Sequence, residues 1–228
     1  MSKATGVLLV RNDGALLLQL RDNKKNIKHV VLNAKNHEKT DPPTPQDIII
    51  FAPQFFEILK EAEKLGAFIL LHPLSTRAHD IMGEYHLINL IGNPMETTTA
   101  AANLIFSGFM DKLPNIKICL SHAGGYLPFA IGRFDHAYNT RKDVSDNLSR
   151  KPSDYLGNFY YDTITHSDTG LNQVIEILGA DRILLGTDFP ADMGVKQPLK
   201  WINSINFSDD IKTKICSSNA ENVLSLNR

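Results

Sequence analysis

Four β-rich segments of the chain are each followed at once by a residue that can bind a metal ion or move a proton. These residues are His72, His122, Asp162 and Asp188. Each alone has a simpler interpretation, because strand-end histidines are often hydrogen-bonded structural residues and strand-end aspartates often cap helices. Together, imidazole and carboxylate groups form the usual catalytic sites of zinc and other divalent ions, with a base close by. The four residues therefore predict a metal-dependent site.

The elements that must position these side chains alternate along the chain. Short runs rich in β-branched, aliphatic or aromatic residues occupy 68–72, 116–122, 159–162 and 182–186. Apolar residues at helical spacing fill 55–65, 101–108 and 171–178 between and around them. Such alternation predicts right-handed βαβ units and a parallel sheet, in which the carboxyl ends of all strands meet at one edge.

The first part of the chain follows another pattern. Apolar runs at 6–10 and 15–20 flank Asp13-Gly14, which predicts an antiparallel β-hairpin. Prolines at 42, 43 and 45 disfavour both helix and strand and predict a boundary near 40–48. We therefore expect a hairpin segment at 1–40 and an α/β domain at 48–228. The hairpin weakly resembles the opening of Nudix hydrolases, but Lys60–Gly66 lacks their glutamate-rich signature, and Nudix activity is not expected.

Composition excludes several classes of partner. The 24 Lys and Arg residues against 25 Asp and Glu residues give a net charge of −1, which provides no basic field for nucleic acid or an anionic membrane. No apolar run reaches the roughly 20 residues that span a bilayer, and we expect neither a signal peptide nor an anchor. Two cysteines, Cys119 and Cys216, are too few for a disulfide framework and fit a cytoplasmic location.

Six motifs follow one another in the part of the sequence from about residue 50 to the end. They are His72-Pro73, Gly92–Thr98, Ser121–Phe129, Gly132–His136, Tyr155–Asp162 and Gly186–Pro190. In this order and spacing they resemble the amidohydrolase-related (amidohydrolase 2) family of aminocarboxymuconate-semialdehyde decarboxylase. One such motif would be a weak signal, whereas six in the family's order are specific.

The resemblance implies a (β/α)₈ barrel with one divalent metal ion, usually zinc, that decarboxylates aromatic or unsaturated acids without oxidation; some members are hydrolases or hydratases. It implies His72 and Asp188 as metal ligands, and it places His122 beside Asp188 in catalysis as the base for metal-bound water. Arg133 matches an arginine that reaches a substrate carboxylate across a dimer interface, and its planar guanidinium suits a carboxylate. For His166 we expect a loop or helix-cap role.

The chain departs from the family pattern in two ways. The family's first strand carries His-x-His, which supplies two metal ligands, and no His-x-His occurs here. Four barrel strands cannot close a sheet that needs eight, so we predict a partial TIM barrel, the C-terminal half with about four βα units. The sheet edges left open predict a homo-oligomer.

Two functions remain open. One is a metal-dependent carboxy-lyase or hydrolase that acts on a small aromatic or unsaturated carboxylic acid. The other is a catalytically silent, truncated barrel that serves at most as a binding or association module. Metal content of the purified protein separates them.

Overall fold

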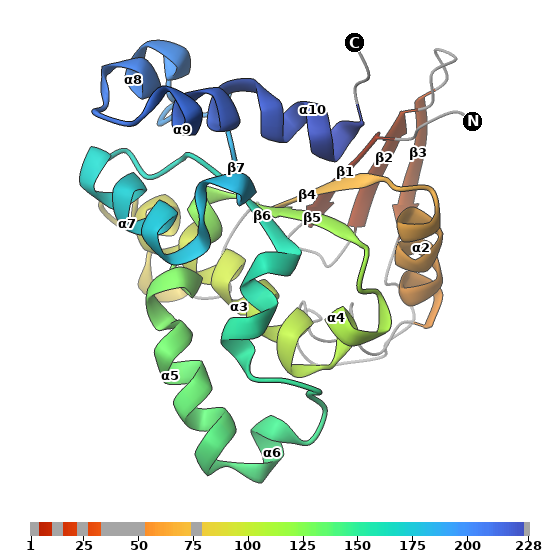
Figure 1. Cartoon of the computed structure of the whole chain (residues 1–228). Helices are drawn as coiled ribbons and strands as arrows, with labels where there is room; N and C mark the ends of the chain where they lie inside the picture. Colours follow the sequence, from red (N-terminus) through yellow and green to blue (C-terminus); the bar gives the residue numbers. More distant parts are fainter. Residues whose placement is uncertain (1–4, 11–15, 22–26, 33–52, 74–78, 226–228) are drawn as a thin grey trace.

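A seven-stranded sheet in the order β3-β2-β1-β4-β5-β6-β7 organises the molecule (Figure 1). The computed structural model describes the backbone of residues 5–10, 16–21, 27–32, 53–73 and 79–225, and the side chains of 56–73 and 80–225. The strands are β1 (Thr5–Val10), β2 (Leu16–Arg21), β3 (Ile27–Leu32), β4 (Phe68–Pro73), β5 (Lys117–Leu120), β6 (Phe159–Asp162) and β7 (Ile183–Leu184).

Strands β4 to β7 are parallel to one another, as the alternation of strands and helices predicts. Strand β1 pairs parallel with β4, while β2 pairs antiparallel with both β1 and β3. An α/β fold with a parallel sheet is therefore confirmed. The connection at 11–15 and the predicted boundary at 40–48 lie outside the described residues, so the hairpin and the division into 1–40 and 48–228 stay predictions.

Helices connect and cover the parallel strands. They are α2 (Pro53–Lys64), α3 (Asn93–Phe106), α4 (Phe109–Lys112), α5 (Leu127–Thr140), α6 (Lys142–Ser145), α7 (Asp168–Leu178), α8 (Pro198–Ser204), α9 (Asp209–Thr213) and α10 (Asn219–Leu224). Short helical turns are η1 (His79–Ile81), η2 (Ile88–Gly92), η3 (His122–Gly124), η4 (Pro152–Asn158), η5 (Ala180–Arg182) and η6 (Lys214–Ser218). In the parts of the chain that the structure describes, no helix has the length and apolar character to cross a membrane.

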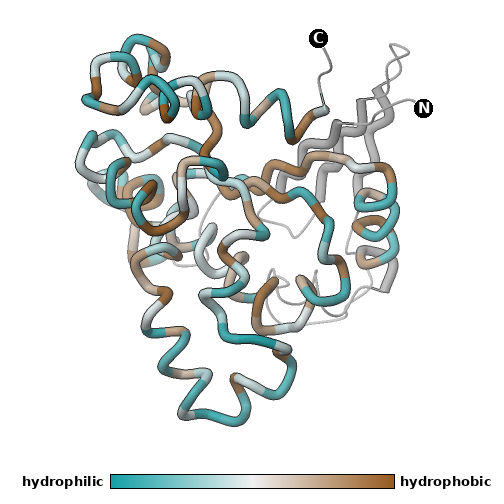
Figure 2. Tube along the Cα trace, viewed as in Figure 1, coloured by the Kyte–Doolittle hydropathy of each residue, from teal (hydrophilic) through white to brown (hydrophobic). Residues whose placement is uncertain are grey.

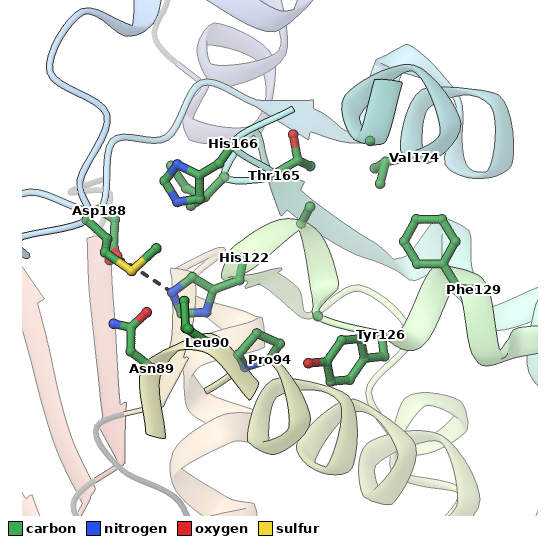
Figure 3. Close-up of a pocket in the computed structure, with 15 residues that line it drawn as sticks. Asn89, Leu90, Pro94, His122, Tyr126, Phe129, Thr165, His166, Val174 and Asp188 are labelled. Atoms are coloured by element: carbon green, nitrogen blue, oxygen red, sulfur yellow. Dashed lines mark ion pairs between the residues drawn. The ribbon is translucent and has the colours of Figure 1, made fainter. Parts of the chain in front are cut away.

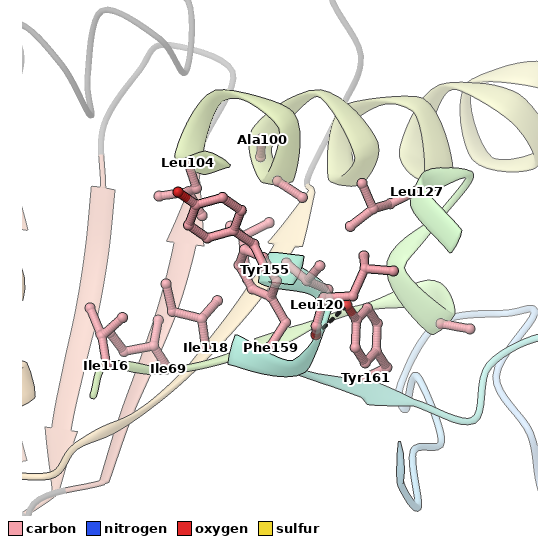
Figure 4. Packing of buried hydrophobic residues seen from close by; sticks show 14 of the residues in the cluster. Ile69, Ala100, Leu104, Ile116, Ile118, Leu120, Leu127, Tyr155, Phe159 and Tyr161 are labelled. Carbon is pink, nitrogen blue, oxygen red and sulfur yellow. Dashed lines mark hydrogen bonds between the residues drawn. The ribbon is translucent and has the colours of Figure 1, made fainter. Parts of the chain in front are cut away.

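The main core lies on one face of the sheet (Figure 4). Alternate residues of β4 to β6, among them Ile69, Leu120 and Tyr161, point into it and are fully buried or nearly so. Helices α3, α5 and α7 supply the facing apolar side chains, including Leu104 and Leu127. Burial of large aliphatic and aromatic groups on this face fixes the register of each strand, because a slip by one residue would turn them to the opposite face.

Helix α10 covers the opposite face of the same strands. Val223 packs there with Cys119 and Leu184, beside the partly buried Phe68 and Tyr160. Hydrophilic residues dominate α6 and the end of α5 that lies away from the sheet (Figure 2). Parallel strands covered on both faces leave their carboxyl ends as the accessible edge, which is where ligands bind in such folds.

Buried Tyr155 in η4 and Ser149 in the loop before it both bind Asp111 in α4. The Tyr155 hydroxyl donates to Asp111 Oδ2 at 2.6 Å, and the Ser149 hydroxyl donates to Asp111 Oδ1 at 2.8 Å. Burial acts to raise the pKa of the Asp111 carboxyl, but the hydrogen bonds from Tyr155 and Ser149 outweigh it and hold this pKa below 3.8. These contacts therefore stabilise the fold above the ordinary pKa of aspartate and are lost as pH falls through the lower, folded-state pKa.

We expect Tyr155→Phe to lower the free energy of unfolding by about 0.5–1.5 kcal/mol at neutral pH, because a hydrogen bond to the charged, solvent-exposed Asp111 carboxylate is lost. Urea unfolding of wild type and variant at about pH 7 and about pH 3 measures this, and the difference should shrink at the acidic pH as Asp111 becomes protonated. A difference of the same size at both pH values would contradict this role of Asp111.

Candidate metal centre

Two histidines and an aspartate from three separate strand ends meet at the carboxyl edge of the sheet. His72 lies near the end of β4, His122 opens the turn after β5, and Asp188 follows β7. His72 Nε2 lies 3.0 Å from Asp188 Oδ1, and His122 Nε2 lies 3.7 Å from Asp188 Oδ2. The imidazole centroids are 4.9 Å apart. The structure thus brings together three of the four residues that the strand ends singled out (Figure 3 shows His122 and Asp188).

Two hydroxyl groups lie behind the imidazole of His122. Ser121 Oγ lies 3.3 Å from His122 Nδ1 and 3.4 Å from Thr97 Oγ1, and Thr97 Oγ1 is also within hydrogen-bond distance of the Asn93 carbonyl oxygen. Because Nδ1 contacts Ser121, Nε2 is the ring nitrogen that faces Asp188 and is placed to take a proton or a metal ion.

Burial is the main influence on the charge of His122. It lowers the pKa of the imidazole below its ordinary value of 6.5, and the neighbouring Asp162 and Asp188 carboxylates only partly oppose this. Burial also raises the pKa of the Asp162 carboxyl, against backbone N–H donors that favour its charged form. Neutral His122 is thus the form that the site favours at neutral pH.

The backbone around the cluster adopts conformations that few residues other than glycine tolerate. His122, Ala123 and Asp188 have φ values of 55°, 52° and 57°. Gly124 and Gly125 follow with φ of 81° and 63°. Left-handed conformations at residues with a Cβ are strained, and such residues concentrate at functional sites. The small residues after His122 make this tight turn possible.

A pocket of about 310 Å³ opens beside His122 and Asp188. Sequence reasoning missed several of its lining residues. Tyr126 and Phe129 come from the start of α5 (Figure 3), and His166 lies in the loop after β6 in a left-handed conformation. The helix cap in that loop is Ser167, whose Oγ accepts from the Gly170 N–H, so His166 is free to face the pocket. The pocket is lined by Asn89, Leu90, Pro94, His122, Ala123, Gly125, Tyr126, Phe129, Ile164, Thr165, His166, Gly170, Val174, Asp188 and Met193.

Two residues that the sequence singled out, Asp162 and Arg133, are not among those that line the pocket. The Asp162 carboxylate turns toward backbone N–H groups of the loops after β5 and β6. Arg133 is exposed on α5 and is not among the residues that line the pocket. Its predicted role at a dimer interface stays a prediction.

The donor set fits a divalent metal ion. One ligand atom from each of His72, His122 and Asp188 lies within 4.8 Å of the other two. The side chain of Asp188 is only 12% exposed, and within the described residues both of its ion pairs are with these histidines. A largely buried carboxylate beside two imidazoles is a suitable environment for zinc or manganese.

Comparison with known proteins places the chain in a family. A family model described as Amidohydrolase (Amidohydro_2) matches residues 6–226. The chain belongs to the amidohydrolase family. The match also includes the N-terminal strands, whose likeness to the Nudix hairpin stays a prediction.

Relatives within the amidohydrolase family are decarboxylases by name. The chain is 38% identical over 176 residues to 2-amino-3-carboxymuconate-6-semialdehyde decarboxylase of Dictyostelium discoideum, a match that covers 76% of this chain and 49% of the relative. The chain thus spans about half the length of that curated relative.

Two solved structures extend the comparison to metal and ligand. A dihydroxybenzoic acid decarboxylase from Polaromonas sp. JS666, with bound manganese and the inhibitor 2-nitroresorcinol, superposes with a TM-score of 0.72 at 29% identity, over 83% of this chain and 57% of that one. A 2,6-dihydroxybenzoate decarboxylase from Rhizobium gives a TM-score of 0.70 at 28% identity, over 82% and 58%. These findings support a divalent metal ion in this amidohydrolase, without singling out zinc.

Proposed function

We propose that this chain carries the metal-dependent catalytic centre of a nonoxidative decarboxylase that acts on a small aromatic or unsaturated carboxylic acid. The observation that carries the proposal is the convergence of His72, His122 and Asp188, two of which, His122 and Asp188, line a pocket with aromatic side chains in its wall. The relatives reported above are named as decarboxylases, which favours loss of carbon dioxide over hydrolysis. We also propose that the sheet is part of a TIM barrel, as its structural neighbours suggest.

In this proposal His72 and Asp188 hold the metal ion and His122 moves the proton. A divalent ion at this position would supply Lewis-acid chemistry for oxygen atoms of the substrate. The pocket wall formed by Tyr126 and Phe129 suits the flat face of an aromatic or unsaturated acid, because aromatic rings favour offset or edge contacts. Asp188 Oδ2 lies 3.7 Å from His122 Nε2, and both side chains line the pocket.

In the proton step, Nε2 of neutral His122 takes a proton from solvent and donates it to the substrate carbon that bears the carboxylate. The bond between that carbon and the carboxylate then breaks, its electron pair stays with the ring or alkene, and carbon dioxide leaves. His122 thereby returns to its neutral form, with Nδ1 still in contact with Ser121 Oγ.

Release of carbon dioxide tests the proposal. The protein, loaded with manganese, would be incubated with 2,6-dihydroxybenzoate, 5-carboxyvanillate and related hydroxylated or unsaturated acids. We expect manganese-dependent carbon dioxide release from at least one of them, abolished by a chelator and by Asp188→Asn. No release from any acid by manganese-loaded protein would contradict the proposal and leave the silent-barrel alternative standing.

A further inference from the structure

Asp162 contacts the site through backbone groups. Its Oδ2 accepts from the His122 N–H at 3.0 Å, and its Oδ1 accepts from the N–H groups of Ala123 and Ile164 at 2.8 and 2.9 Å. One carboxylate therefore links the loop after β5 to the loop after β6. Three backbone donors at these distances use most of its acceptor capacity.

The turn that Asp162 holds is strained. His122 and Ala123 both adopt left-handed conformations, and the N–H groups of both residues donate to the one Asp162 carboxylate. Consecutive N–H groups in such a turn form a concave site for an anion. Asp162 supplies that anion from within the chain, and a charged acceptor makes these hydrogen bonds stronger than neutral ones would be.

Gly186, in the segment after β7, leaves room for the Asp162 side chain. A Cβ added to Gly186 would lie 2.8 Å from Asp162 Cβ and 3.3 Å from Asp162 Cγ. The Gly186 N–H also donates to Thr163 Oγ1 at 3.1 Å, which holds the start of the segment leading to Asp188 against β6. Gly186 and Asp162 thus form one packed unit between the His122 turn and the Asp188 loop.

We infer that Asp162 is a positioning residue that fixes the imidazole of His122 toward the pocket by holding the backbone of the His122–Ala123 turn, and that Gly186 is required for this contact. The inference rests on the proposed function, because it assigns Asp162 to the group that moves the proton. Asp162 is not among the residues that line the pocket, and its carboxylate reaches His122 at the backbone N–H.

Substitution of Asp162 by asparagine separates positioning from simple folding. The side-chain amide of the Asp162→Asn variant keeps one oxygen that can accept from the N–H groups of Ala123 and Ile164. Its NH₂ group then faces the His122 N–H, and two donors cannot form a hydrogen bond. We expect kcat to fall about 10- to 100-fold, as for other residues that orient an active group, while KM and manganese affinity change by less than about threefold. Gly186→Ala should cause a similar loss, and the double variant should be no worse than the poorer single variant.

Matched controls exist in the chain. Asp135 on α5 also accepts a backbone N–H, from Ser153 at 2.9 Å, so Asp135→Asn makes the same chemical change away from the site. Gly132→Ala adds a methyl group where no heavy atom lies within 4 Å. Neither control should change kcat by more than about twofold.

NMR spectroscopy of ¹⁵N-labelled protein tests the positioning without turnover. In wild type the His122 and Ala123 amide protons should be shifted downfield by the carboxylate, and Asp162→Asn should move the His122 amide and imidazole signals while Asp135→Asn does not. An Asp162→Asn variant with normal kcat, or with stability, manganese affinity and kcat reduced in parallel, would overturn the inference. If wild type shows no turnover, the proposed function fails, and unchanged His122 signals in Asp162→Asn would then overturn the positioning role separately.

Discussion

His122→Gln should lower kcat by about 10²–10⁴-fold, since general acid catalysis by a positioned side chain contributes that much. Glutamine approximates the length of histidine but cannot donate and regain a proton at the position of Nε2. Manganese affinity should change by less than about tenfold, because His72 and Asp188 still hold the ion in the proposed arrangement. Steady-state kinetics and isothermal titration with Mn²⁺ measure the two quantities separately.

His136→Gln is the matched control for this variant. His136 is exposed on α5 and is not among the residues that line the pocket, so its replacement should leave both quantities unchanged. If His122→Gln instead lost manganese as completely as Asp188→Asn, His122 would be a metal ligand and could not be the proton carrier. Normal kcat in His122→Gln would remove it from the mechanism.

Gly125→Ala should be strongly destabilising. An added Cβ would lie 2.2 Å from the Pro94 carbonyl oxygen and 2.8 Å from Thr98 Oγ1, and the residue has φ of 63°. The Pro94 carbonyl belongs to the first turn of α3, and Thr98 Oγ1 already accepts from the Tyr126 N–H at 2.7 Å. Neither the carbonyl nor the hydroxyl can therefore move away from an added Cβ without breaking existing structure. A backbone clash and a left-handed conformation together should cost about 3 kcal/mol or more.

Urea unfolding measures the expected decrease in the free energy of unfolding of Gly125→Ala. Gly132→Ala, in open space within α5, should be neutral or stabilising by up to about 1 kcal/mol. Equal unfolding free energies for Gly125→Ala and wild type would show that the turn after β5 does not pack on α3 as described.

The parallel sheet could be predicted because each strand carries a strong local signal. Phe68–His72 and Phe159–Asp162 are short, apolar and bounded by polar or turn residues, and they form β4 and β6 almost as expected. The last strand is shorter than its apolar run, because the Leu185 N–H donates to the Ile215 carbonyl of η6 instead of continuing the ladder. That bond depends on a residue thirty positions away, which local patterning does not contain.

Part of the site could be predicted because the strands that position it have strong local signals. Strand ends identified His72, His122 and Asp188, because residues at the carboxyl ends of parallel strands must share an edge. The direction of the Asp162 side chain could not be predicted, since it follows from left-handed φ values at His122 and Ala123. The place of His166 in the pocket wall likewise follows from its φ of 53°. Its position in the sequence, four residues after the end of β6, could have identified it as a candidate pocket residue.

The most direct test of the metal centre is equilibrium dialysis against Mn²⁺ followed by elemental analysis of wild type and of the double variant His72→Ala/Asp188→Ala. Two of the three converging donors are absent from the double variant, so it should lose the ion if the cluster holds it. We predict about one manganese ion per wild-type chain at saturation and none above background in the double variant. Wild type without manganese, or a double variant that retains as much as wild type, would contradict the metal centre.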